Sequence, residues 1–266
     1  MNYFPILIKL AGRRVLVCGS NDEAEFKIRL LLKSSAEIVV FGTPTKKRIT
    51  QWSEEGLIQY NNRLVEERDC YNIAFAYVTL KKGMERNATL RILTKTKIPY
   101  CVVDDKLHSD FITPAIVDRN PVTVAIGSEG TAPALVRHIK AQIENILPQQ
   151  TGLVARITGA FRPFVYRLSE SHVRRHFWTR FFNQAKSQIF SHSSNQDLET
   201  KLKTKLHDLL KSKENFKISN YPVQFVSAGP GDPDLLTRKA ANVLHDGEVI
   251  LYDRLIAPEI LELCRR

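Results

Sequence analysis

The chain has 266 residues, of which 43% are hydrophobic and 25% charged, a composition that suits two folded domains with part of a third rather than a disordered chain. No apolar run approaches the ~20 residues that span a bilayer, which argues against a transmembrane helix. The amino terminus has no basic leader and no small-residue cleavage site, so we expect no signal peptide.

The formal net charge of +11 is concentrated in one region. Residues 151–217 carry 13 Lys and Arg against 5 Asp and Glu, a net charge of +8. Such a surface suits nucleic acid, a membrane surface, or a small molecule with many carboxylates. The four cysteines have no zinc-ligand spacing, so we expect free thiols in a reducing cytoplasm and no metal cage; they are Cys18, Cys70, Cys101 and Cys264.

The first residues predict a strand, a tight turn and a helix. An apolar strand over 14–19 ends in glycine, a helix follows over 22–32, and a second apolar strand covers 36–41. This order is how a dinucleotide-binding unit begins. The alternative is a strand-to-helix turn in a sheet that binds no cofactor.

The glycine fingerprint of this turn is incomplete. Gly19 and Ala24 occupy its first and last positions, but Asn21 stands where a glycine normally lets the backbone approach a pyrophosphate. Asp22 and Glu23 add negative charge near the expected phosphates, and no acid follows about 20 residues later, where a ribose partner is usual. By itself this motif is weak.

Strands and helices alternate through the first hundred residues, which predicts a parallel sheet covered by helices on both faces. The further strands are expected at 57–60, 73–78 and 100–103, and the further helices at 46–55 and 84–95.

The stretch from 101 to 133 carries the strongest sign of chemistry. Asp104 follows a buried strand, at the edge where open α/β sheets place ligands. A strand over 122–126 leads through a turn containing Ser128 to Thr131, a candidate N-cap for a helix over 132–147. Ordinary turn and capping roles are the alternative for all three residues.

Three basic helices are expected at 153–168, 170–190 and 198–213, followed by a linker over 211–220. Their aromatic residues are typical of core packing; the alternative is a lip that attracts an anionic substrate. The last 46 residues restart an α/β pattern, with strands at 223–226 and 248–252, a helix over 235–244 and a glycine-proline loop between them.

These residues resemble the siroheme synthase family along nearly the whole chain. The resemblance lies in FPILIKLAGRRVLVCG at the start, CVVDD at 101–105, FITPAIVDRNPVTVAIGSEGTAPALVR at 111–137, and VSAGPGDPDLLTRKA with VILYDRLIAPEIL at the end. It implies a precorrin-2 dehydrogenase and sirohydrochlorin ferrochelatase, fused to a uroporphyrinogen-III C-methyltransferase.

The resemblance also implies roles for individual residues. Asp104 corresponds to the family's catalytic aspartate, and Ser128, with Thr131 in the same turn, to its substrate cleft. The expected NAD contacts are Gly19, Ser20, Asn21, Asp22, Glu23, Thr43 and Pro44. In the methyltransferase part, Pro230 corresponds to an S-adenosylmethionine contact and Asp253 to the proton acceptor.

The implied architecture is a Rossmann-like domain over 1–113, a dimerisation segment over 114–150, a basic helical domain over 151–217 and a partial methyltransferase domain over 218–266. The implied partners are precorrin-2, sirohydrochlorin, ferrous iron as a substrate and a second copy of the chain, without nucleic acid or membrane. S-adenosylmethionine would bind only an intact methyltransferase domain, so we expect no methylation by this chain.

Two departures from the family affect the cofactor side. Asn21 replaces a glycine, and Tyr77 to Lys81 lacks the acid that follows the family's fourth strand. We therefore expect weakened NAD binding with Asp104 retained for chelation. The competing hypotheses are a degenerate, non-catalytic or chelatase-only relative acting as a dimeric structural protein, and a basic nucleic-acid-binding module, for which no motif is present.

Overall fold

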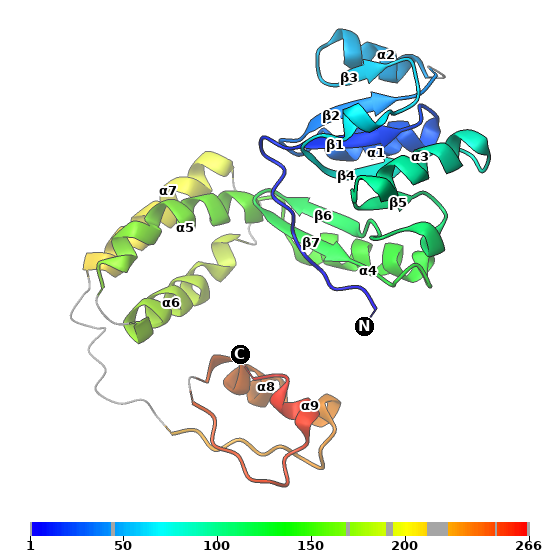
Figure 1. Cartoon of the computed structure of the whole chain (residues 1–266). Coiled ribbons are helices and arrows are strands. Elements are labelled where there is room, and N and C mark those ends of the chain that lie inside the picture. Colours follow the sequence, from blue (N-terminus) through cyan, green and yellow to red (C-terminus); the bar gives the residue numbers. More distant parts are fainter. Residues whose placement is uncertain are drawn as a thin grey trace. The chain divides into compact units, whose positions relative to one another are not determined.

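The computed structural model describes residues 2–43, 46–168, 171–189, 194–211, 223–247 and 249–264. The chain divides into two compact units (Figure 1). The first unit comprises residues 1–162 with 185–203, and the second comprises residues 163–184 with 204–266.

The first unit contains a five-stranded sheet in the order β3-β2-β1-β4-β5, and all its pairings are parallel. The strands are β1 (Arg14–Cys18), β2 (Glu37–Phe41), β3 (Gln59–Asn61), β4 (Ile73–Val78) and β5 (Tyr100–Val102). The helices between them are α1 (Asp22–Leu31), α2 (Lys47–Glu54) and α3 (Met84–Lys95). This confirms the Rossmann-like parallel sheet that the alternating pattern predicts.

The central strand β1 shows why this sheet is buried on both faces. Val15 and Val17 pack into one hydrophobic cluster with side chains of α1 and α2. Leu16 and Cys18 point the other way and pack with Leu93 of α3. Because successive side chains of a strand alternate between faces, a strand covered on both sides has to be apolar throughout.

The order of connections reverses at β1. The chain leaves β1 toward β2 and β3, then returns to the other side of β1 as β4. In open α/β sheets, ligands bind at the carboxyl ends of the strands beside such a reversal. The candidate site is therefore expected where β1 and β4 end.

A small hairpin follows the sheet, made of β6 (Ala115–Arg119) and β7 (Val122–Ile126), with α4 (Pro133–Ile146) packed on it (Figure 1). The sequence analysis predicted β7 but missed β6. The short β6 sequence, AIVDR, contains two charged residues and has no apolar alternation of its own. Its pairing with β7 makes it a strand, for example through Ile116 opposite Ala125.

The three basic helices are α5 (Thr151–Tyr166), α6 (Ser171–Ile189) and α7 (Asn195–Lys211), each within a few residues of its prediction. The start of α5 rests against the hairpin turn, where Arg156 donates a hydrogen bond of 2.8 Å to the Asn120 carbonyl. Core packing, the expected role of the aromatics, holds for the buried Phe161, Phe177 and Phe181. The exposed aromatics are Phe164, Tyr166 and Phe182.

The carboxyl-terminal segment differs from its prediction. Helices α8 (Arg238–Asp246) and α9 (Pro258–Leu261) form, and Thr237 caps α8, so this helix begins later than expected. Neither predicted strand forms in the described residues 223–226 and 249–252. Phe225 and Leu251 are 97% and 94% exposed, because no described neighbour in this segment pairs with their backbones or covers their side chains.

No helix in the described ranges is both long and apolar enough to cross a membrane.

Candidate functional site

The turn between β1 and α1 fits only glycine at its first position. Gly19 has a φ of 127°, and its N–H donates to the Phe41 carbonyl at 2.7 Å. A Cβ on Gly19 would lie 2.1 Å from the Thr79 hydroxyl oxygen and 3.3 Å from the Leu80 nitrogen. The end of β1 is thereby held tightly between the ends of β2 and β4.

The ends of β1 and β2 are also joined by side chains. The buried Ser20 hydroxyl donates to the carbonyl of Thr43. A Cβ on Gly42 would lie 3.1 Å from the Gly19 Cα, so a glycine is required there too, which the sequence analysis missed. Gly19, Ser20 and Thr43 are thus brought together, whereas Pro44 lies outside the described residues.

Asn21 is the N-cap of α1 and reaches across the end of the sheet. Its side-chain oxygen accepts from the Ala24 N–H at 3.0 Å, and its amide nitrogen donates to the Thr79 carbonyl at 2.8 Å. Its φ of −88° is common for any residue, so Asn21 does not adopt the left-handed conformation that would favour a glycine here. The side chain instead bridges the gap between β1 and β4, where a dinucleotide would cross.

Asp22 and Glu23 are in the exposed first turn of α1. The Asp22 carboxylate pairs with the Lys46 ammonium at 2.5 Å, and this hydrogen bond raises the pKa of Lys46. The pair offsets part of the negative charge that opposes a pyrophosphate at this helix end, and Glu23 has no such partner among the described residues.

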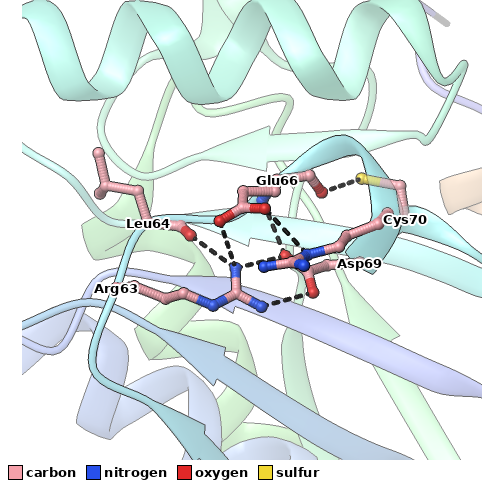
Figure 2. A network of polar contacts seen from close by, with 6 residues as sticks. Arg63, Leu64, Glu66, Asp69 and Cys70 are labelled. Carbon is pink, nitrogen blue, oxygen red and sulfur yellow. Dashed lines mark hydrogen bonds and ion pairs between the residues drawn. The ribbon is translucent and has the colours of Figure 1, made fainter.

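Beside β2, the residues between β3 and β4 form a network of polar contacts with one another (Figure 2). Arg63 donates to both oxygens of Asp69, at 2.7 and 2.8 Å, and its guanidinium stacks over the Phe41 ring at 4.9 Å. The hydrogen bond from Arg63 lowers the pKa of Asp69, and Asp69 also accepts from the Glu66 N–H. This network fastens the chain after β3 to β2.

Asp104 follows β5 in an unusual conformation. It has a φ of 56°, which is uncommon for a residue other than glycine. The Asp105 N–H donates to the Val102 carbonyl at 3.2 Å, so Asp104 is the third residue of a tight turn, where glycine or asparagine is favoured. Its side chain is exposed, and its carboxylate bonds to none of the described residues.

Unlike Asp104, Asp105 has a largely buried and fully bonded side chain. Its side chain is only 10% exposed and pairs with the Arg86 guanidinium of α3, which is 8% exposed. Its other oxygen bonds the His108 ring at 2.9 Å, and its carbonyl accepts from the Ser109 hydroxyl at 2.7 Å. The hydrogen bonds from His108 and then Arg86 lower the pKa of Asp105 from 3.8 to about 2, against its partial desolvation.

The loop that carries Asp104 contacts the turn after β7. The Lys106 ammonium donates to the Glu129 carbonyl at 2.5 Å and lies over the Tyr3 ring at 5.6 Å. The Glu129 carboxylate in turn accepts from the Asn2 N–H at 2.8 Å. The fold therefore brings the two halves of the stretch from 101 to 133 into contact.

The expected cap at Thr131 is wrong. The N-cap of α4 is Ala132, and the Thr131 hydroxyl turns back to the Ser128 carbonyl at 2.5 Å. Pro133 is the first residue of α4, so the capping position is Ala132, one residue after Thr131. The Ser128 hydroxyl instead accepts from the Ala132 N–H at 3.2 Å, and this half-buried side chain helps start α4.

In the second unit, Pro230 and Asp253 are both exposed. The Asp253 carboxylate accepts from the Leu255 N–H at 2.6 Å, which is ordinary turn chemistry. A Cβ on Gly231 would lie 3.6 Å from the Ala257 Cβ, so the glycine-proline loop approaches the turn after Asp253.

Among the described residues, no three His, Cys, Asp or Glu side chains are grouped so that they could hold a metal ion.

Two family models match the sequence. Residues 6–115 match a family described as NAD(P)-binding, and residues 222–266 match the tetrapyrrole (corrin/porphyrin) methylases.

Curated relatives match the chain from end to end. It is 34% identical over 270 residues to the siroheme synthase of Neisseria meningitidis serogroup B, and 33% identical over 267 residues to that of Methylococcus capsulatus. These alignments cover 100% of this chain but 54% and 56% of those proteins, so the chain spans about half the length of the curated relatives it matches.

A solved structure, SirC, precorrin-2 dehydrogenase, is similar in fold. It matches with a TM-score of 0.53 and 21% identity, and the match covers 80% of this chain and 100% of that chain. This likeness supports the Rossmann-like architecture.

The ion pair of Asp105 predicts a particular acid response. Because its folded pKa of about 2 is below its usual 3.8, Asp105 contributes stability that is present above pH 3.8 and lost as the pH falls toward 2. In Asp105→Asn, the free energy of unfolding should fall less steeply over this window. Urea unfolding at a series of pH values measures it, with the exposed Glu85→Gln as the control; equal slopes in wild type and Asp105→Asn would contradict the prediction.

Proposed function

We propose that this chain, which is homologous over its whole length to siroheme synthases, oxidises precorrin-2 to sirohydrochlorin with NAD and then inserts ferrous iron. The observation that carries the proposal is Asp104. Its carboxylate is exposed and unbonded to the described residues, at the carboxyl edge of a parallel sheet whose neighbouring turn has the shape of a dinucleotide site.

The β1–α1 turn supports binding of the dinucleotide. Gly19 and Gly42 leave no room for side chains where the ends of β1 and β2 meet, and the amino terminus of α1 lies beside them. Gly19, Ser20 and Thr43 would hold the cofactor on one side, while Asn21 and the acidic first turn reduce the attraction for its pyrophosphate. A bound NAD would supply the acceptor for the hydride.

Asp104 supplies the proton chemistry of both steps. Oxidation of precorrin-2 removes one hydride and one proton, and the Asp104 carboxylate takes the proton. Insertion of Fe²⁺ into sirohydrochlorin releases two protons from pyrrole nitrogens, which the same carboxylate accepts in turn. A side chain without a partner among the described residues is suited to this, because it gives up no hydrogen bond to them when it receives a proton.

The substrate's charge agrees with the composition of the chain. A tetrapyrrole with many carboxylates is attracted to a protein of net charge +11, and residues 151–217 hold most of that excess. Ser128 belongs to the turn that Lys106 fastens to the Asp104 loop, so we assign this turn to the same substrate. Thr131 belongs to the same turn, and we assign it to the same substrate.

The segment matching tetrapyrrole methylases carries a separate proposal. In an intact methyltransferase domain, Pro230 would contact S-adenosylmethionine and Asp253 would accept a proton. We place all of these activities in the cytoplasm, in keeping with four cysteines that form no disulfide.

A second candidate function is a chelatase without dehydrogenase activity. The bridge from Asn21 to the Thr79 carbonyl favours it, because this side chain occupies the gap that the cofactor has to cross while the Asp104 loop is intact. A purely structural relative is less favoured, because the exposed Asp104 carboxylate bonds to none of the described residues.

Asp104→Asn tests the proton role. It keeps the shape of the side chain and tolerates a positive φ, but it cannot accept a proton at neutral pH. We expect both precorrin-2 oxidation and iron insertion to fall by roughly 100-fold or more, as for loss of a general base. Absorbance of the tetrapyrrole measures both steps, with Glu85→Gln as the control for loss of one exposed acid; an Asp104→Asn protein as active as wild type would refute the proposal.

Asn21→Gly tests the effect of the bridge on the cofactor. Removing the side chain should lower the dissociation constant of NAD by about threefold or more, since the pyrophosphate can approach the backbone. Asn21→Ser is the matched control, because serine still caps α1 but cannot reach Thr79. Isothermal titration measures the affinities; micromolar binding of NAD to wild type, or no gain in Asn21→Gly, is the opposing result.

We also infer a homodimer through the hairpin and α4. None of the α4 residues is buried, and Leu135 and Ile146 of this helix are exposed. A two-stranded sheet with one amphipathic helix is marginal by itself, so a second copy is the simplest cover for these side chains. Analytical ultracentrifugation at micromolar concentration should give twice the mass of the chain, and a single-chain mass would exclude this arrangement.

A further inference from the structure

We propose that Arg86 is a positioning residue: through its buried ion pair with Asp105, it holds the backbone of Asp104 in the left-handed conformation that presents the carboxylate outward. The catalytic part of this inference rests on the proposed function, but the conformational part does not. Arg86 is in the first turn of α3, 18 positions before Asp104, and touches it only through Asp105.

The first argument is the strain at Asp104. A φ of 56° at the third position of a tight turn is favourable for glycine and unfavourable for a residue with a Cβ. Such a conformation persists only when the surrounding structure enforces it. The Asp104 side chain has no described partner that could do so, which leaves its two neighbours in the chain.

The second argument is how these neighbours are held. Val103 is fixed by one backbone hydrogen bond of 3.0 Å, from its N–H to the Val78 carbonyl at the end of β4. Asp105 is fixed by its N–H, its carbonyl and both carboxylate oxygens, which bond the Val102 carbonyl, the Ser109 hydroxyl, Arg86 and His108. The orientation of residue 105 is therefore determined far more strongly than that of Asp104.

The third argument singles out Arg86 among the partners of Asp105. The His108 side chain is 63% exposed, so its own position is not fixed by packing, although its hydrogen bond is the larger cause of the lowered pKa of Asp105. The Arg86 side chain is 8% exposed and is anchored in a helix that packs on the sheet, so its position is fixed independently of the loop. Breaking a desolvated pair leaves a charge without compensation, so Arg86 constrains residue 105 from a fixed position through a contact that is costly to break.

A stability comparison of four variants tests the conformational claim. Asp104→Ala and Asp104→Gly both remove the carboxylate, so the difference between them reports the cost of a Cβ at a positive φ minus the larger unfolded-state entropy of glycine, a contribution that is the same with and without the ion pair. The same two changes are then made together with Arg86→Leu and Asp105→Asn. Replacing both partners leaves no uncompensated charge, so these proteins are expected to fold.

The urea midpoint of the glycine variant should exceed that of the alanine variant when the Arg86–Asp105 pair is intact. Without the pair, the loop can relax, and this gap should shrink by about half or more. A gap of unchanged size would overturn the inference, because the pair would then not enforce the conformation. An alanine variant as stable as the glycine variant, or more stable, with the pair intact would overturn it as well, since the strain at Asp104 would then not exceed the unfolded-state entropy of glycine.

An activity comparison tests the consequence for catalysis. With Asp104 present, Arg86→Leu/Asp105→Asn should lower kcat for precorrin-2 oxidation roughly 10- to 100-fold, as a small misplacement of a reacting group does, while KM and the dissociation constant of NAD stay within about threefold. The single variant Arg86→Lys, with Asp105 unchanged, should keep most of kcat, because a positive charge still pairs with Asp105. The matched control is an exposed pair that also starts from α3, between Lys95 and Glu67 of the helical turn Glu67–Cys70. Lys95→Met/Glu67→Gln should leave kcat unchanged.

The two arms separate the possible failures. A pair variant with wild-type kcat would refute the positioning role. If Asp104→Asn itself were fully active, the proposed function would fail, whereas the difference between alanine and glycine at position 104 would still decide whether Arg86 enforces the backbone conformation.

Discussion

The site depends on the contrast between two adjacent carboxylates. Asp105 is desolvated and bonded at every polar atom, whereas Asp104 has an exposed carboxylate and a positive φ. Asp105 is fixed by its partners, and the preceding residue, Asp104, projects from the end of the sheet. The arrangement works only because α3 carries a buried arginine to the end of β5, and this requires β4, α3 and β5 to form one parallel crossover.

The same edge of the sheet holds a second constraint, at the start of the chain. Gly19, Gly42 and Thr79 come from the ends of β1, β2 and β4 and leave almost no space between them. A turn packed this closely suits a dinucleotide, yet Asn21 spans part of it and Asp22 brings a charge that Lys46 balances. We therefore expect weakened NAD binding beside an unobstructed Asp104, so oxidation and chelation are best measured separately.

The sequence predicted the parts of the fold that depend on local pattern. The strands β1 and β4 are continuous apolar runs, and α3 is predicted to the residue. Pairing was harder to predict: β6 is a strand only because β7 lies beside it, and the strand-like residues around Phe225 and Leu251 find no partner among the described residues. Asp104 was identified from its place after a strand and from a family resemblance. Arg86 was missed because its contact with Asp105 arises from the crossover, which no spacing of residues reveals.

The central claim is that the Asp104 carboxylate faces the macrocycle. A crystal structure of the chain with sirohydrochlorin bound tests this most directly. The account predicts the carboxylate within hydrogen-bonding distance of a pyrrole nitrogen, with residue 104 at a positive φ and Asp105 still paired with Arg86. A macrocycle bound elsewhere, or one whose nitrogens face away from Asp104, would contradict it.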